Sequence, residues 1–223
     1  MQQTPMHDRP NPDLLAMIPP HAQRILEVGC SSGALAKAHV AQHPQCDYVG
    51  LDVDPEYVQV AQQFCRESYV LDIEKADAFF YKHYADRECW IFGDALEHLK
   101  DPWAVLQKIR GVIPQQGCVL ACIPNAQHWS LQLKLATGQF HYQPQGLLDR
   151  THLRFFTRQT MVEMFESSGF QVAQVVPRIF PEPQRQTVLP IIGQLAALTG
   201  QDARQAMEAA TPMQYILKAV PQV

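Results

Sequence analysis

The sequence is poor in charged residues and gathers neither sign into a block. Among its 223 residues, 18 lysines and arginines stand against 22 aspartates and glutamates, which gives a formal net charge of −4. A protein that binds nucleic acid directly needs a concentrated positive face, and none is indicated here. DNA and RNA are therefore not expected as partners.

Cysteine pairs at metal-ligand spacing are also missing. The chain has six cysteines and no C-x-x-C pair, so neither a zinc site nor a disulfide framework is predicted, and no metal is expected. We interpret the thiols as reduced core residues of a cytosolic protein. They are Cys30, Cys46, Cys65, Cys89, Cys118 and Cys122.

Hydrophobic runs long enough to span a bilayer are absent. The run VLPIIGQLAAL, inside residues 181–211, has about a dozen residues, which is too few for a transmembrane helix. Its flanks are not basic, so residues 181–211 are expected to be a helical lid or packing segment rather than a membrane anchor. The first residues, MQQTPMHDRPNPD, have no apolar core and no basic leader, which argues against a secretory signal and favours a cytoplasmic location.

Strand-like and helix-like segments alternate along the chain, which predicts a parallel sheet with helices on both faces. The 223 residues, 47% of them hydrophobic, suffice for a single domain spanning 1–223 with a substantial core. Seven strands are expected, at residues 24–28, 48–51, 68–71, 88–92, 117–123, 170–176 and 214–220. Helices are expected at residues 13–18, 33–42, 55–65, 76–83, 103–112 and 158–168, with a helical turn at 95–99.

The most informative segment is RILEVGCSSGAL, residues 24–35. It predicts a buried strand, a tight turn between Gly29 and Gly33, and the start of a helix. Such a turn brings backbone N–H groups close to a ligand. The next apolar run ends in Asp52, about twenty residues further on, where an acidic side chain can bind ribose hydroxyls. Together these features predict a site for an adenosine-containing cofactor.

The identity of that cofactor depends on the middle of the turn. A dinucleotide fingerprint, G-x-G-x-x-G, needs a glycine there so that the backbone can touch the pyrophosphate. Here the position is Ser31, whose side chain would crowd a pyrophosphate. S-adenosylmethionine has no phosphate, and the turn leaves room for its methionine tail. A nicotinamide-dependent oxidoreductase and a non-catalytic module that binds S-adenosylmethionine stay open as alternatives.

Three segments resemble class I S-adenosylmethionine-dependent methyltransferases over residues 20–176. EVGCSSG is similar to the first motif of that family, and YVGLDVDPEYVQVAQQF to the second. In YVLDIEKAD, the resemblance implies that Asp72 hydrogen-bonds the adenine amino group and that Ile73 covers the ring. The predicted cofactor-binding residues are Glu27, Gly29, Cys30, Ser31, Gly33, Asp52, Val53, Asp72, Ile73, Gly93 and Asp94.

A narrower resemblance begins at DALEHLKDP (94–102) and continues through CIPN (122–125) and GLLDRTHLRFFT (146–157). This series resembles bacterial methyltransferases that accompany, or are fused to, glycosyltransferases in surface-glycan assembly. The resemblance implies a small-molecule or glycan acceptor. It also implies a Rossmann-like doubly wound sheet of seven strands, mostly parallel with an antiparallel last strand.

Residues 124–157 form an insertion that is too long for an ordinary connection and follows the end of a strand, where open α/β sheets bind their ligands. Its segment DRTHLR, from Asp149 to Arg154, offers a carboxylate, an imidazole and two guanidinium groups. A polar loop whose charges pair with each other explains the same residues. As acceptor-binding residues we predict Trp129, Tyr142, Arg150 and Arg154, because guanidinium groups clamp carboxylates or phosphates.

Methyl transfer from a sulfonium requires the nucleophile, the methyl carbon and the sulfur to be in line, so positioning supplies much of the acceleration. A hydroxyl acceptor must also lose a proton, which a histidine that titrates near neutrality can accept. The predicted bases are His152 and then His98, with Asp149 orienting an imidazole. An amine acceptor needs less help, and a homodimer stays possible.

Overall fold

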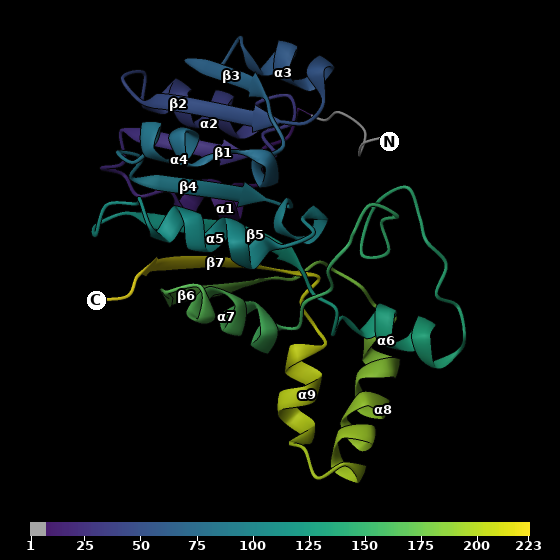
Figure 1. Cartoon of the computed structure of the whole chain (residues 1–223). Coiled ribbons are helices and arrows are strands. Elements are labelled where there is room, and N and C mark those ends of the chain that lie inside the picture. The colour runs from purple at the N-terminus through teal and green to yellow at the C-terminus, as the bar shows by residue number, and fades with distance from the viewer. Residues whose placement is uncertain (1–7) are drawn as a thin grey trace.

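Seven strands form one sheet in the order β3-β2-β1-β4-β5-β7-β6 (Figure 1). Strands β1 to β5 run parallel, whereas β7 runs antiparallel to both of its neighbours, β5 and β6. The predicted α/β fold with an antiparallel last strand is therefore confirmed. The strands are β1 (Arg24–Val28), β2 (Asp47–Asp52), β3 (Glu67–Val70), β4 (Cys89–Gly93), β5 (Cys118–Pro124), β6 (Phe170–Arg178) and β7 (Gln214–Pro221).

The computed structural model describes residues 8–223. Residues 1–7 lie outside this range. They are part of the N-terminal segment in which no secretory signal is expected. Helices cover both faces of the sheet: α1 (Pro12–Met17), α2 (Ala34–Gln42) and α3 (Pro55–Ala61) one face, and α4 (Ala78–His83), α5 (Pro102–Arg110) and α7 (Arg158–Ser167) the other. Two 3₁₀ turns, η1 (Ile73–Lys75) and η2 (Leu96–His98), follow β3 and β4.

Aspartates and prolines set the starts of two helices. Asp54 precedes α3 and Asp101 precedes α5, and each is followed by a proline at the first helical position. The Asp54 carboxylate accepts a hydrogen bond from the Glu56 N–H at 2.9 Å, and Asp101 accepts one from Ala104 at 3.0 Å. These side chains satisfy N–H groups that have no partner inside the helix.

Strand β4 shows how the sheet is buried on both faces. Its alternate residues Trp90 and Phe92 pack with α4, α5 and α7, whereas Cys89 and Ile91 pack with α1 and α2. All four side chains are fully buried, and burial of one large apolar side chain stabilises the fold by about 1.5–3 kcal/mol. The central strand thus joins the two helical layers to one sheet. All six cysteines are free, and five of them are buried.

The insertion at residues 124–157 contains a helix, α6 (Trp129–Ala136), where none was expected. Helix α3 ends at Ala61 rather than at Cys65, because the chain turns there and buries the Cys65 side chain against α2. The other predicted elements occur within about two residues of their expected ends, which is the usual uncertainty of helix and strand boundaries.

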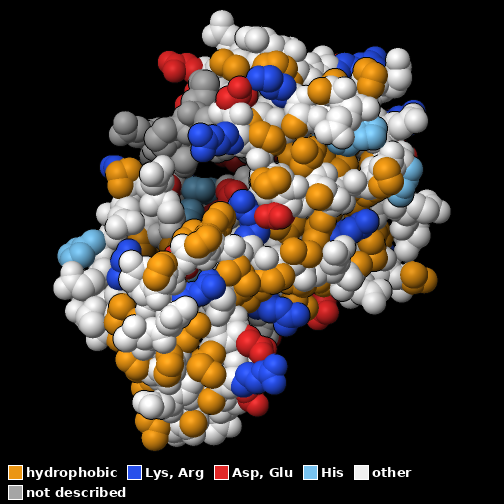
Figure 2. All heavy atoms as spheres, turned by 180° about the vertical axis from the view of Figure 1, so that it is seen from behind, with side chains coloured by type: hydrophobic (Ala, Val, Ile, Leu, Met, Phe, Trp, Pro, Cys, Tyr) orange, Lys and Arg blue, Asp and Glu red, His pale blue; other side chains and the backbone are white. Residues whose placement is uncertain are grey.

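Residues 181–211 contain two packed helices, α8 (Arg185–Leu198) and α9 (Ala203–Ala209), which extend away from the sheet (Figure 1). Trp129 of α6 packs against Ile192 of α8 and Ala210, which attaches the pair to the insertion. Hydrophobic side chains remain on the surface of this lobe, at the bottom of Figure 2; on α8 they are Ile191, Leu195 and Leu198. Among residues 8–223, no helix combines the length and the apolar character needed to cross a bilayer.

Candidate active site

The turn between β1 and α2 has the left-handed backbone that its glycines allow. Gly29 has φ of 74° and Gly33 has φ of 77°, and Ser31 between them has φ of 48°. A Cβ atom on Gly29 would lie 3.0 Å from the Cβ of Ala95, which leads into η2. The turn therefore needs glycine at position 29, both for its backbone angle and for its closeness to η2. The absence of a side chain there leaves a small cradle at the carboxyl end of β1.

Asp52 stands at the carboxyl end of β2 and braces this turn. Its two carboxylate oxygens accept hydrogen bonds from the Ser31 N–H at 2.8 Å and the Asp54 N–H at 2.9 Å. Asp52 is only 7% exposed, and burial raises its pKa although these hydrogen bonds oppose the shift. Asp54 caps α3 as expected, but Asp52 is not a free carboxylate. Each carboxylate oxygen has a second lone pair, so Asp52 keeps acceptor capacity for ribose hydroxyls.

Glu27 lies in β1 beneath the same turn, and the Tyr48 hydroxyl donates a hydrogen bond to it at 2.8 Å. It is 4% exposed, and burial raises its pKa to about 8. Gly93, at the end of β4, faces Glu27: a Cβ atom there would lie 3.9 Å from the Glu27 Oε1 and 3.2 Å from the Leu14 Cδ2 of α1. The lack of a side chain at Gly93 therefore leaves space beside this carboxyl group.

The side chains predicted to bind adenine differ in their exposure to solvent. Val53 is 51% exposed beyond the end of β2, and Asp72 stands at the start of η1, where it forms an ion pair with Lys75 at 3.0 Å. Ile73 is 2% exposed and packs in the core, so its side chain does not lie open to an adenine ring. Cys30 is also buried. The structure therefore brings Val53 and Asp72 to the surface of the site, while Ile73 and Cys30 offer only their backbone.

Asp94 connects the cofactor end of the site to the last strand. It follows Gly93 with φ of 56°, a left-handed conformation that is uncommon outside glycine. Its Oδ1 accepts hydrogen bonds from the side-chain amide of Gln214, in β7, and from the Cys122 thiol at 3.5 Å. The strained residue thus lies where β4, β5 and β7 meet.

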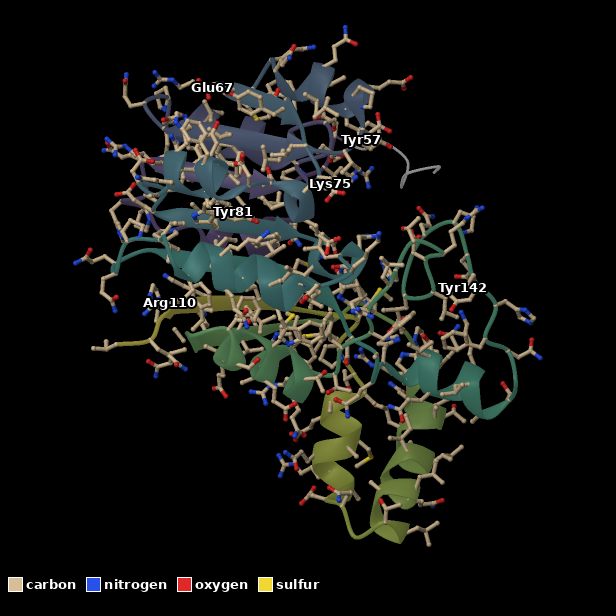
Figure 3. All side chains as sticks on the ribbon, viewed as in Figure 1. Tyr57, Glu67, Lys75, Tyr81, Arg110 and Tyr142 are labelled. Atoms are coloured by element: carbon tan, nitrogen blue, oxygen red, sulfur yellow. The ribbon has the colours of Figure 1, made fainter. Side chains whose placement is uncertain are left out.

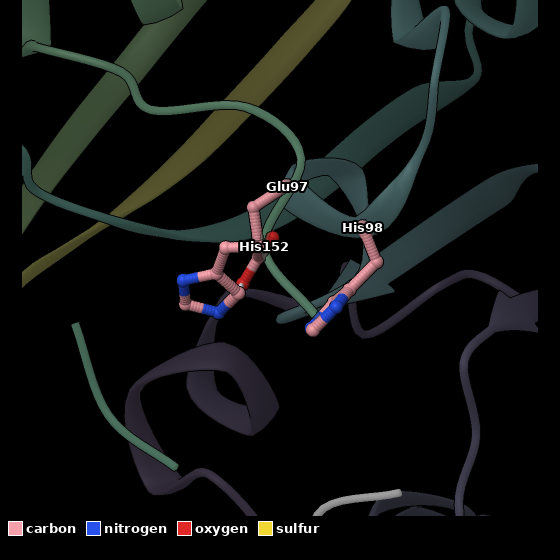
Figure 4. A group of neighbouring side chains, drawn as sticks. All are labelled: Glu97, His98 and His152. Atoms are coloured by element: carbon pink, nitrogen blue, oxygen red, sulfur yellow. Dashed lines mark ion pairs between the residues drawn. The ribbon is translucent and has the colours of Figure 1, made fainter. Parts of the chain in front are cut away.

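The two predicted bases lie together. The backbone N–H groups of Leu153 and Arg154 donate to the Glu97 carbonyl oxygen at 2.8 and 3.0 Å, which ties the end of the insertion to η2. As a result the His98 and His152 rings meet edge to face, with centroids 4.8 Å apart. Figure 4 shows both rings beside the Glu97 side chain.

Asp149 acts on this pair through a residue that the sequence analysis did not single out. Its Oδ1 accepts hydrogen bonds from the Thr151 N–H at 2.8 Å and the Thr151 hydroxyl at 2.6 Å. The Thr151 hydroxyl in turn lies 3.0 Å from the His98 Nδ1. Burial opposes ionisation of Asp149, but the hydrogen bonds from Thr151 and the nearby histidines hold its pKa below the ordinary value. Thr151 therefore links the Asp149 carboxylate to the His98 ring.

Both imidazoles are neutral bases near neutral pH. Burial lowers the pKa of His98, and burial together with the neighbouring His98 ring lowers the pKa of His152. A neutral imidazole has one ring nitrogen with a free lone pair, which can accept a proton or bind a metal ion.

The four predicted acceptor-binding residues are not gathered at one place. Tyr142 is 62% exposed on the insertion loop, beyond the carboxyl ends of the strands, on the same side of the sheet as Tyr57 and Lys75 (Figure 3). Arg150 is exposed, and the Arg154 guanidinium donates to the Lys100 carbonyl oxygen.

Trp129 is 9% exposed and packs in a separate hydrophobic cluster. Its indole N–H donates to Glu182 at 3.0 Å, and its ring packs against α8. Its expected role in binding the acceptor gains no support from this placement, because the ring is buried in the contact between α6 and α8.

Comparison with protein families identifies the class. Residues 6–175 match the model of a family described as a methyltransferase domain, and the chain belongs to this family. The membership confirms the predicted class, a methyltransferase that uses S-adenosylmethionine, over the nicotinamide-dependent alternative. The left-handed glycine turn and the carboxylate acceptors of Asp52 and Asp72 are groups that fit this cofactor. A comparison with curated proteins gives no significant match.

Solved structures share the fold at low sequence identity. A Listeria monocytogenes protein described as an S-adenosylmethionine-dependent methyltransferase has a TM-score of 0.63 at 15% identity, over 95% of this chain and 97% of that one. A chain from the complex of the Haloferax volcanii Trm112 methyltransferase activator with a methyltransferase has a TM-score of 0.62 at 16% identity, over 95% and 88%. The [4+2]-cyclase SpnF has a TM-score of 0.58 at 16% identity, over 95% and 80%. Since a cyclase has the same fold, the reaction must be argued from the site.

Proposed function

We propose that this methyltransferase transfers the methyl group to a hydroxyl oxygen of a small-molecule or sugar acceptor bound beneath residues 124–157. The observation that carries the proposal is the pair of neutral imidazoles, His98 and His152, whose rings are 4.8 Å apart beside η2. The close approach of Gly29 to Ala95 ties η2 to the cofactor turn. An O–H acceptor needs a base, and a buried pair of imidazoles is suited to that task.

The cofactor, when bound, supplies a methyl group on a sulfonium leaving group. The hydrogen-bond acceptors at the strand ends would hold it: Asp52 the ribose, Asp72 the adenine amino group, and Glu27 the methionine end. The space left at Gly29 would accommodate the tail. His152 Nε2 would accept the proton of the acceptor hydroxyl, and the remaining acceleration would come from alignment.

The exposed side of the insertion supports a polar, anionic acceptor. Arg150 presents a free guanidinium fork to solvent, and Tyr142 presents an exposed aromatic ring that could stack on a sugar face. Such a pair suits a sugar acid or a nucleotide-linked sugar. The same features support the narrower kinship with methyltransferases of glycan assembly.

The experiment measures methyl transfer from labelled S-adenosylmethionine to a panel of sugar acids, nucleotide sugars, phenols and amines. We expect transfer to a hydroxyl group, and a loss of turnover of about a hundredfold in His152→Asn with nearly unchanged affinity for S-adenosylhomocysteine. His141→Asn, an exposed histidine of the same insertion, is the matched control and should keep full turnover. Transfer to amines alone, or full activity of His152→Asn, would contradict the proposal.

A further inference from the structure

Glu97 is a buried carboxylic acid without a hydrogen-bond partner among the described residues. Its side chain is 1% exposed, and neither carboxylate oxygen has a hydrogen-bond partner within residues 8–223. The His152 Nε2 lies 4.0 Å from Oε1, which is too long for a hydrogen bond. Burying an ionised carboxylate without a partner is strongly unfavourable, so a native protein normally pairs such a group or uses it to bind a metal ion.

Two imidazoles converge on this carboxylate. One ligand atom each from Glu97, His98 and His152 can be chosen so that all three lie within 4.8 Å of one another. Figure 4 shows how Glu97 and His98 project from η2 while His152 approaches from the end of the insertion. Two ligands of one tetrahedral ion lie about 3.3–3.6 Å apart, because each metal–ligand bond is about 2.0–2.2 Å long, so the three side chains would move together by roughly 1 Å to share an ion.

The surroundings of the imidazoles favour metal binding. The Thr151 carbonyl oxygen, 3.2 Å from the His98 Nδ1, can only accept, so Nδ1 carries the proton and Nε2 keeps its lone pair. The Thr151 hydroxyl donates a hydrogen bond to the Asp149 carboxylate, which fixes the position of Thr151. Metal-binding histidines typically have their second nitrogen held by a carbonyl or carboxylate in this manner.

We propose that Glu97, His98 and His152 bind one divalent first-row transition-metal ion, of which Zn²⁺ and Mn²⁺ are the candidates to test. One carboxylate and two imidazoles are a ligand set that such ions accept, and three protein ligands leave coordination positions open. Sequence analysis predicted no metal because it considered paired cysteines, whereas this set joins two neighbouring residues to a histidine from a distant segment.

The role of the ion deepens, and rests on, the proposed O-methylation. An acceptor hydroxyl coordinated at an open position becomes more acidic and releases its proton to water. The acceptor oxygen then forms its bond to the methyl carbon while the carbon–sulfur bond breaks and the electron pair stays on sulfur, which leaves S-adenosylhomocysteine. In this form of the site, His152 is a ligand, and the ion takes over the activation of the hydroxyl.

Metal binding is measured on the full chain after treatment with a chelator and dialysis. Calorimetric titration with Mn²⁺ and with Zn²⁺, and metal content after desalting, should give one ion per chain. Glu97→Gln and His152→Asn should each weaken metal binding at least tenfold. Replacing a residue that merely hydrogen-bonds a metal ligand already weakens binding by about 10–100-fold. His141→Asn and Glu208→Gln, both exposed and outside the cluster, are matched controls that should bind as the native chain does.

Thermal unfolding of the same preparations gives a readout that needs no acceptor. The ion should raise the melting temperature of the native chain and leave Glu97→Gln unchanged. The chelated Glu97→Gln variant should melt higher than the chelated native chain, since it lacks the unpaired carboxylate. The absence of stoichiometric binding to the native chain, or full affinity in both cluster variants, would overturn the proposal.

Titration with S-adenosylhomocysteine separates the two proposals. Retained binding of this product by the native chain and by Glu97→Gln, together with loss of the ion in the variant, supports the metal site. Binding of the product without any binding of Mn²⁺ or Zn²⁺ refutes the metal site and leaves the methyltransferase proposal standing. Saturable metal binding in a chain that methylates no hydroxyl refutes the O-methylation and leaves the metal site intact.

Discussion

At the scale of single residues, the cofactor end of the site depends on carboxyl groups that the fold buries. Asp52 and Glu27 stand at the ends of neighbouring strands, and both are less than a tenth exposed. Two backbone N–H groups donate hydrogen bonds to Asp52, which favours its charged form. Glu27 accepts only one hydrogen bond, from the Tyr48 hydroxyl, and burial raises its pKa to about 8. The two carboxyl groups therefore differ: Asp52 is a fixed hydrogen-bond acceptor, and Glu27 is a titrating group.

Asp52→Asn should weaken S-adenosylhomocysteine binding by roughly 1.5–3 kcal/mol, because a charged acceptor for the ribose hydroxyls is replaced by a neutral one. Isothermal titration calorimetry measures the change. Asp54→Ala is the control: it removes the cap of α3 and should lower the free energy of unfolding by about 1 kcal/mol with little loss of affinity. Equal affinity losses in the two variants would remove Asp52 from the binding site.

Glu27 should make the stability of the chain depend on pH. Burial raises its pKa in the fold from the ordinary 4.5 to about 8, so the native state binds the proton more tightly than the unfolded state does. This contribution is complete below the unfolded pKa and is lost as pH rises through about 8, a change of roughly 3–5 kcal/mol. Urea unfolding between about pH 5 and pH 9 should show this fall, and Glu27→Gln should reduce it. Equal slopes in both chains would contradict the assignment.

At the scale of elements, the sequence predicts some connections and not others, as the turn between β1 and α2 and the attachment of α6 to α8 illustrate. The first was predictable, because a strand, a glycine turn and a helix are written in one contiguous segment. The second was not, since its contacts join Trp129 and His128 to Glu182, which is far along the chain. The short helix α6 also has no strong periodic pattern of its own.

Gly29→Ala should lower the affinity for S-adenosylhomocysteine more than tenfold. Alanine strains the left-handed backbone, and its Cβ would meet Ala95 at 3.0 Å and shift the turn. Gly138→Ala is a matched control, since its φ of 71° carries the same backbone strain but nothing lies within 4 Å of the added atom. It should lose only about 1 kcal/mol of unfolding free energy and keep its affinity. Comparable affinity in the two variants would show that space at Gly29 does not matter.

Glu182→Ala should loosen the α8–α9 pair without changing cofactor binding. The variant leaves the His128 Nε2 and the Trp129 indole N–H without their partner, at a cost of roughly 1–3 kcal/mol for each buried group. Limited proteolysis should then cleave within residues 181–211 faster, while calorimetry finds the same affinity. Glu208→Ala breaks an exposed ion pair with Arg204 and should change neither property. Slower cofactor binding in Glu182→Ala would instead support a lid role for this segment.

At the scale of the whole molecule, the sequence was sufficient for the sheet, its order of elements and the class of cofactor. Alternating apolar segments predict strands and helices locally, and the motif residues follow strands whose ends meet at one edge. Side-chain surroundings were less predictable: Ile73 and Trp129 were expected at a ligand and are packed in hydrophobic clusters. Glu97 has no hydrogen-bond donor among the described residues, and His152, which comes nearest, belongs to a distant segment. No local pattern in the sequence predicts this arrangement.

The central claim is that the carboxyl edge of the sheet holds the cofactor with its reactive end toward η2. A crystal structure of the full chain with S-adenosylhomocysteine tests it most directly. The account predicts the ribose at Asp52, the adenine between Val53 and Asp72, the tail over Gly29, and the sulfur facing His98 and His152. A product molecule bound elsewhere, or a sulfur atom that faces away from the two imidazoles, would contradict it.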